Sequence, residues 1–124
     1  MSTVTIDGLA DAIIKELNDY SEEVAEQIKK DVKKVANQCK KEIQQNSPKD
    51  RGEYAAGWKV KVEFENANDI RVVIHNAKLP GLPHLLENGH AKVNGGRVAG
   101  IPHIRPAELN AEKELLGRVK VAVR

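Results

Sequence analysis

The sequence predicts an α+β fold in a single domain over residues 1–124: a long N-terminal helix, a small antiparallel sheet and a C-terminal helix. Three observations predict this class. Residues 6–46 keep apolar side chains on one helical stripe. Residues 58–76 form two runs that alternate apolar and polar residues around a short polar turn. Residues 106–121 carry a second helical pattern that opens with a proline.

The N-terminal helix is predicted from the spacing of its apolar residues. Ile6, Ile13 and Tyr20 lie seven apart, and from Val24 onward the apolar positions recur every eleven residues. The pattern changes near residue 20, where Ser21 can cap a second helix. Unbroken, the helix would span roughly 60 Å, whereas a compact domain of this size has a radius of gyration of about 14 Å. We therefore expect it either to break near residue 20 or to project and pack on another subunit.

The middle of the chain predicts a loop, a brief turn and a β-hairpin. Pro48 ends the helix, because the residue before a proline avoids helical angles. Residues 58–65 and 70–76 are the predicted strands, and residues 66–69 supply the turn. The helical stripe is the natural cover for the apolar face of this hairpin, which carries Trp58, Val60, Val62, Phe64, Ile70, Val72 and Ile74.

A segment rich in histidine, glycine and proline follows, from His84 to Pro106. It predicts one helical turn over residues 84–88, a mobile stretch over residues 92–100, and a short strand over residues 101–105 that joins the hairpin. Pro106 suits the first turn of a closing helix. A compact domain seldom keeps so long a connection unless it has a function.

The composition excludes several classes of protein. The net charge of +2 comes from 20 basic and 18 acidic residues, which is too balanced for a typical nucleic-acid binder. Cys39 is the only cysteine, so no internal disulfide can form, as suits a reducing cytoplasm. We expect no signal peptide and no membrane contact, because the opening residues are not basic and no apolar run approaches the ~20 residues of a membrane span.

Three histidines and a glutamate suggest a metal site as one alternative. His84, Glu87 and His90 are spaced three apart, and His103 follows; imidazole and carboxylate groups are good zinc ligands. Two histidines that bind zinc from one helix are usually spaced i, i+4, whereas here they are six apart with Gly89 between them. Ordinary hydrogen bonds in a loop, or contacts at an interface, are the other interpretations. A metal-dependent enzyme thus remains an alternative function.

The remaining nucleophiles do not predict catalysis. Cys39 lies on the apolar stripe, where a cysteine usually behaves as a small buried hydrophobe. The serines lie in caps and turns, and Gly95-Gly96-Arg97 lacks the strand and helix that flank a phosphate-binding loop. We therefore predict no catalytic residues, no cofactor and no enzymatic activity.

Six lysines on the polar face of the long helix suggest a second alternative, a small DNA-associated protein. The same face also carries glutamates, which favours a solvated surface over a site for a polyanion. The lysines are Lys29, Lys30, Lys33, Lys34, Lys40 and Lys41.

Three short motifs, in order, resemble those of the neck and tail-component proteins of long-tailed phages. Ser47–Tyr54 (S-P-K-D-R-G-E-Y), followed by Trp58, is similar to a signature near the front of that family. Leu85–His90 (L-L-E-N-G-H) and Pro102–Ala107 (P-H-I-R-P-A) resemble two later segments. The order and spacing match, and the resemblance extends over essentially the whole chain.

The resemblance implies a structural protein of a phage or prophage, acting at the head–tail junction or the tail end as a ring of identical subunits. Its implied partners are copies of itself and neighbouring head-completion or tail proteins; its implied location is the virion, after assembly in the bacterial cytoplasm. We expect an ion pair between Glu87 and Arg105 to join the two ends of the loop. The structural or interface candidates are Asp50, Gly52, Trp58, Glu87, Gly89, His90, Arg105 and Pro106.

Overall fold

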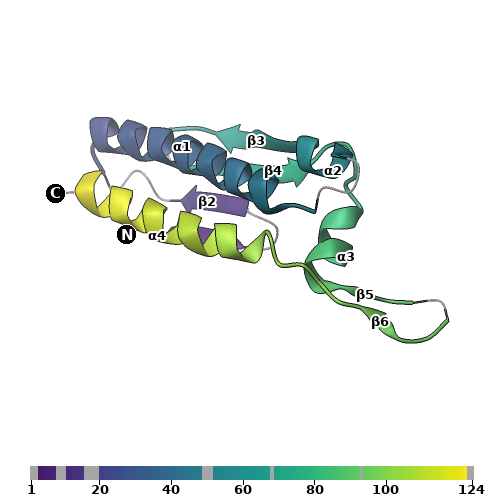
Figure 1. Ribbon diagram of the computed structural model, residues 1–124. Helices are drawn as coiled ribbons and strands as arrows, with labels where there is room; N and C mark the ends of the chain where they lie inside the picture. The colour runs from purple at the N-terminus through teal and green to yellow at the C-terminus, as the bar shows by residue number, and fades with distance from the viewer. Residues whose placement is uncertain are drawn as a thin grey trace.

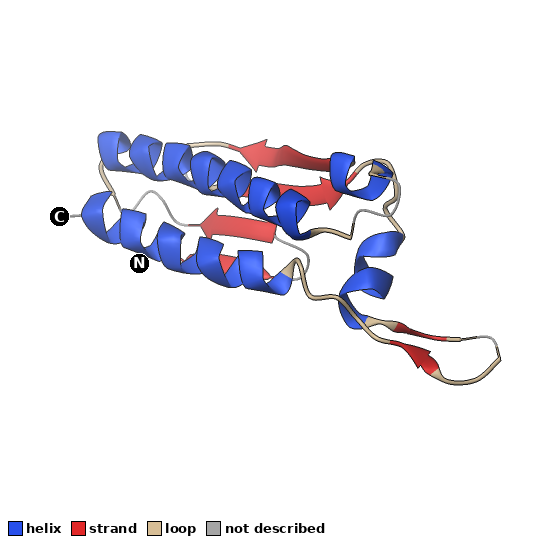
Figure 2. Cartoon of the chain, viewed as in Figure 1, coloured by secondary structure: helices blue, strands red, loops and turns tan. Residues whose placement is uncertain are grey.

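The computed structural model describes residues 3–7, 11–15, 20–48, 52–67, 69–92 and 94–122. Two long helices lie side by side across one face of an antiparallel sheet (Figure 1), so the predicted α+β class is confirmed. Figure 2 shows the helical layer in front of the strands. In chain order the elements are β1 (Thr3–Asp7), β2 (Asp11–Lys15), α1 (Glu22–Asn46), α2 (Glu53–Ala56), β3 (Trp58–Glu65), β4 (Ile70–Asn76), α3 (Leu82–Asn88), β5 (His90–Ala91), β6 (Arg97–Val98) and α4 (Arg105–Ala122).

The main sheet has the strand order β1-β2-β4-β3, so it contains an N-terminal hairpin that we did not predict. Helix was expected from residue 6, but residues 3–7 and 11–15 are strands, and β2 pairs with β4 with Ala12 opposite Val72. Four successive β-branched residues at positions 3–6 favour a strand. The seven-residue spacing of apolar residues favoured a helix instead, and β4, the partner of β2, lies far along the chain.

Helix α1 begins where the break was predicted. Ser21 is its N-cap, and the Ser21 hydroxyl accepts a hydrogen bond from the backbone N–H of Val24 at 3.2 Å. The helix ends at Asn46, one residue before the predicted Ser47-Pro48 stop. Its 25 residues give a length of about 38 Å. The alternative of a single helix of about 60 Å is therefore wrong.

The core lies between the two long helices and the sheet. Helix α1 packs on β3 and β4, while α4 packs beside α1 and reaches β1. Cys39 is buried on the α1 stripe as predicted, and burial raises the pKa of its thiol to about 12. The other buried residues of the core include Ile28, Val32, Val35, Ile43, Trp58, Ile70, Val72, Ile74, Ile104 and Leu115.

The hairpin of β3 and β4 has the predicted bounds, but a β-bulge changes its far end. The register shifts between Val62 and Phe64, so that Phe64 lies opposite Arg71 and Glu65 lies opposite Ile70. Because Ile70 is buried toward the helices, the shift turns Glu65 toward α1 and Phe64 to the other face. The prediction of Phe64 on the buried face is therefore wrong: 41% of it is exposed.

The bulge also explains why Lys29 is not on a solvated face. Its ammonium group contacts Glu26 at 2.7 Å and Glu65 at 3.7 Å, and it donates a hydrogen bond to the carbonyl of Asn66. The hydrogen bond to Glu26 is the main cause of the raised pKa of Lys29. Lys33 also pairs with Glu65, at 2.8 Å. Two of the six lysines proposed to contact DNA are thus engaged by acidic groups of the same chain.

The segment after α3 differs from prediction in two ways. Residues 92–100, expected as a mobile loop, include part of a second hairpin in which β5 pairs with β6. Residues 101–104, expected as a strand, have no strand partner. The reason for the second difference lies in the contacts of Glu87 at the start of α4.

Candidate assembly surface

A projecting segment of residues 90–101 is called the arm here (residue 93 is not described). It contains β5, a turn with Gly95 and Gly96 at positive φ, and β6. The arm extends beyond α3, away from the body of the molecule (Figure 1). Two of its apolar side chains remain uncovered: Val98 is 38% exposed and Ile101 is 51% exposed. Exposed apolar side chains on a projection are typical of a contact surface.

A single carboxylate holds the base of the arm. Glu87, near the end of α3, accepts hydrogen bonds from three consecutive backbone N–H groups at the start of α4. Its Oε1 lies 2.8 Å from the nitrogen of His103 and 2.9 Å from that of Ile104; its Oε2 lies 2.9 Å from the nitrogen of Arg105. We call this arrangement the Glu87 clamp. It uses the N–H groups that a strand over residues 101–105 would have needed, and it fixes the two ends of the arm together.

The clamp favours the ionised form of the carboxylate. Burial by itself would raise the pKa of Glu87, but the backbone hydrogen bonds from His103, Arg105 and Ile104 outweigh it, so the pKa is lowered. The positive end of the α4 dipole acts in the same direction. Glu87 therefore serves as an N-terminal cap for α4 that comes from another helix.

The buried side chain of His103 connects the Glu87 clamp to Tyr54 in the core. The Nδ1 atom lies 2.7 Å from the carbonyl oxygen of Ile101 and 3.1 Å from Oε1 of Glu87. A carbonyl only accepts, so in the neutral ring Nδ1 carries the hydrogen, and Nε2 accepts from the hydroxyl of Tyr54 at 2.7 Å. Burial, and then the negative charge of Glu87, raise the pKa of Tyr54. The ring of Tyr54 meets that of Trp58 edge-on at 5.5 Å between centroids.

Two glycines let the ends of the arm meet. Gly89 has φ +78°, and a Cβ at this position would collide with the carbonyl oxygen of Val98. A Cβ at Gly100 would collide with the carbonyl oxygen of Glu87. The backbone N–H of Ile101 donates to the carbonyl of Leu86 at 2.7 Å in the same region. The base of the arm is therefore a close backbone crossing that tolerates no side chain.

The remaining candidate residues fall into different places. Trp58 is 1% exposed, so it belongs to the core and offers no surface. Gly52 precedes α2 with φ +80°, and Pro106 lies in the first turn of α4 as predicted. Asp50 lies outside the described residues. The expected ion pair is wrong in detail: Glu87 binds the backbone of Arg105, while the guanidinium of Arg105 lies 3.7 Å from Glu108.

The histidines do not converge as a metal site would require. Glu87 and His103 are in contact, but His84 is exposed on α3, and His90 on β5 has a buried Nδ1 without a hydrogen-bond partner among the described residues. In the described part of the chain, no group of three or more histidine, cysteine or acidic residues is placed to hold a metal ion.

Sequence reasoning missed the polar groups that join the loops to the core. The hydroxyl of Ser47 accepts from Nε1 of Trp58 at 3.0 Å and donates to the carbonyl of Ile43 at 2.5 Å. The side chain of Asn76 donates to the carbonyl of Tyr54 at 2.7 Å and accepts from the N–H of Leu79 at 2.9 Å. Their signals were weak: a serine at a helix end and an asparagine that ends a strand.

Comparison with known proteins identifies a family whose sequence model matches this chain. Residues 11–89, more than half of the chain, match the family described as "Bacteriophage HK97-gp10, putative tail-component". The chain belongs to this HK97-gp10-like family. As a member, it is a structural phage protein, with the virion location that a tail component implies. None of the curated proteins and none of the solved structures that were compared matches the chain.

The HK97-gp10-like match contains β2 to α3 and ends at Gly89, immediately before the arm. Two of the three motifs therefore fall within it, apart from the last residue of the second. The third, at residues 102–107, lies beyond its end. No helix in the described ranges is both long enough and apolar enough to cross a membrane.

Proposed function

We propose that this protein acts at the head–tail junction or the tail end of a phage or prophage particle, as a ring of identical subunits that completes or connects the tail. The observation that carries the proposal is the arm of this tail-component family member, which projects from the body and has Val98 and Ile101 exposed. Val98 and Ile101 of the arm stay exposed among the described residues, so a neighbouring protein is a natural partner for these side chains.

Further surfaces suit the same role. β3 is an edge strand of the main sheet, with Val62 and Phe64 exposed, and an edge can offer its backbone groups to a neighbour. One end of α1 offers a third contact. The partners are other copies of this chain and the head-completion or tail proteins next to it in the particle, and assembly takes place in the host cytoplasm. Catalysis has no place in this role, and DNA contact through the α1 lysines is a minor expectation.

Particles made without this protein provide the test. We expect electron microscopy to show filled heads and separate tails, or tails of abnormal length, and a plasmid copy of the gene to restore normal particles. Separate tails would favour the junction, and abnormal tail lengths would favour the tail end. Normal, infectious particles in the absence of the gene would contradict the proposal.

A further inference from the structure

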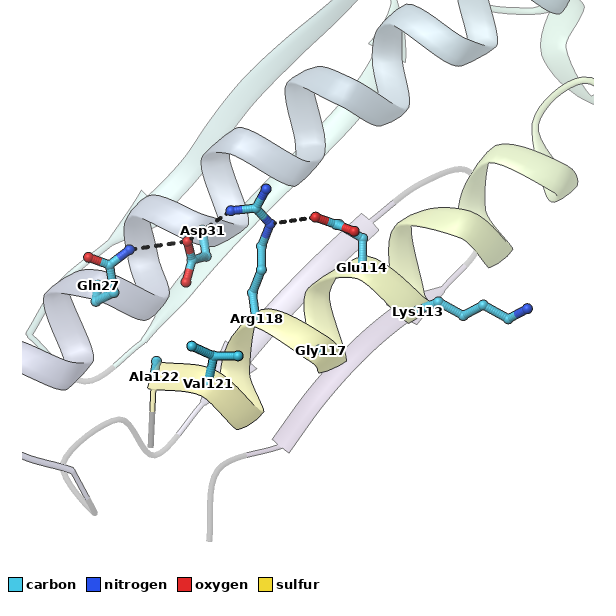
Figure 3. A pocket seen from close by; sticks show the side chains of 8 residues that line it. All are labelled: Gln27, Asp31, Lys113, Glu114, Gly117, Arg118, Val121 and Ala122. Carbon is cyan, nitrogen blue, oxygen red and sulfur yellow. Dashed lines mark hydrogen bonds and ion pairs between the residues drawn. The ribbon is translucent and has the colours of Figure 1, made fainter. Parts of the chain in front are cut away.

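A groove opens between the two long helices at the end of the molecule opposite the arm. It lies between the N-terminal half of α1 and the C-terminal half of α4, and its volume is about 400 Å³ (Figure 3). Six of the residues that line it carry the argument: Asp31, Glu114, Gly117, Arg118, Val121 and Ala122. Binding sites for small ligands have volumes of roughly 300–1,000 Å³, so this groove can take the tip of a protruding element, but not a broad protein surface.

Gly117 is the unusual residue of this groove. It lies within α4, where glycine is less favourable than alanine by up to about 1 kcal/mol. Among the described residues, a Cβ at this position would meet no atom within 4 Å, and its φ is not positive. Close packing within the described part of the subunit therefore does not account for this glycine. Its missing side chain leaves this part of the groove open.

Two carboxylates lie at the floor of the groove. The guanidinium of Arg118 is shared by two carboxylates, Glu114 at 2.8 Å and Asp31 at 3.5 Å. Lys113, on the rim, points away from this cluster (Figure 3). With Lys113 on the rim, the charged residues that line the groove balance, but its floor places two carboxylates and one guanidinium beside the apolar side chain of Val121, which is 66% exposed.

The arm has the complementary properties. No acidic residue occurs between Glu87 and Glu108, and within this stretch the arm contributes Lys92 and Arg97. Its Val98 is exposed next to these charges. A narrow, positively charged hairpin with exposed apolar side chains therefore matches a narrow groove that has an exposed apolar side chain and two carboxylates at its floor.

The geometry excludes contact between an arm and the groove of the same chain. The arm projects at one end of the molecule, while the N-terminal half of α1 and the C-terminal half of α4 lie at the other (Figure 1). We propose that the arm of one subunit docks in the α1–α4 groove of the next. This proposal rests on the self-assembly proposed above. Repeated head-to-tail contacts of one kind close into a ring when the rotation allows it.

Gly117 variants test the groove because they should stabilise the subunit but weaken its self-association. We expect Gly117→Ala to raise the Tm of the subunit by roughly 2–6 °C and to weaken self-association about tenfold, with a larger loss of association for Gly117→Leu. Gly81→Ala is the matched control, because a Cβ added at Gly81 would also meet no atom within 4 Å and this residue lies outside the groove. That control should leave association unchanged. Sedimentation velocity over a range of concentrations measures the association.

Cross-linking between two single variants tests the pairing itself. Asn94→Cys at the arm tip and Val121→Cys in the groove, mixed and treated with a short bismaleimide, should give a covalent dimer that neither variant forms alone. Burial keeps the native Cys39 unreactive, and a mixture of Asn94→Cys with Lys59→Cys, on an exposed strand position, is the control.

The possible outcomes separate this inference from the proposed function. If the parent protein assembles but Gly117→Leu assembles equally well and no specific cross-link forms, the docking inference is overturned while the ring remains. If α4 pairs with α4, Val121→Cys alone will cross-link, which also overturns docking by the arm. A parent that stays monomeric at every concentration would likewise overturn the inference; the particle experiment then judges the proposed function separately.

Discussion

Replacing Trp58 with alanine should lower the free energy of unfolding by about 3–5 kcal/mol, a large share of the ~5–15 kcal/mol available to a domain. The indole is almost fully buried beneath α1. Its removal would leave a cavity beside Tyr54 and His103, whose rings lie 5.5 and 6.4 Å from that of Trp58. It would also leave the hydroxyl of Ser47 without its donor. Urea unfolding at neutral pH measures the change.

The Trp58→Phe variant separates the loss of apolar volume from the loss of the indole hydrogen bond. Phenylalanine keeps most of the apolar volume but lacks the indole N–H that binds Ser47, so we expect a loss of about 1–2 kcal/mol. The alternative role for Trp58, as an interface residue, predicts a different result. A Trp58→Ala variant with nearly the stability of the parent but defective assembly would contradict the burial of this residue in the core.

Replacing Glu87 with alanine should lower the free energy of unfolding by about 2–4 kcal/mol, because three backbone N–H groups lose a charged acceptor together. Glu87→Gln should cost less, since the amide oxygen keeps part of the cap. Both changes loosen the base of the arm. Urea unfolding gives the stability, and hydrogen exchange at the start of α4 should show faster exchange in residues 103–105.

The effect of Glu87 on stability should depend on pH with a definite sign. Its pKa is lower in the folded chain than the ~4.3 of an unfolded chain. Its stabilisation is therefore present above the unfolded pKa and is lost as the pH falls through the folded pKa. The difference between parent and Glu87→Gln should be constant near neutrality and shrink below about pH 4. Glu112→Gln, an exposed change on α4, is the control. A difference that grows in acid would refute the clamp.

The sequence predicted those elements whose pattern is complete within a short window. The β3–β4 hairpin, the Ser21 cap and α4 each combine a regular alternation or stripe with a nearby turn or cap residue. The pattern that decides the N-terminal hairpin is not complete within a short window. Its spacing fitted a helix, and the observation that decides for strands, the pairing of β2 with β4, joins residues about sixty positions apart.

The candidate site shows the same limit. Glu87 was identified as an anchor, but its partners were expected to be a guanidinium rather than three backbone amides, because no side-chain pattern reveals which N–H groups are left without a partner. The β-bulge after Val62 was equally hidden, and it alone decides that Phe64 is exposed and that Lys29 meets Glu65. Gly117 was also hidden, because only the structure shows that it lines the groove and that a Cβ there would meet no described atom within 4 Å.

The central claim is that this protein works through an arm held away from its body, and shortening that arm tests it most directly. Residues 91–97 can be replaced by an Asn-Gly turn, which joins His90 to Val98 across their existing pair. The Glu87 clamp and the core remain intact. In sedimentation velocity beside the parent protein, we predict a shortened chain with an unchanged Tm that no longer self-associates. A shortened chain that assembles as the parent does would contradict the account.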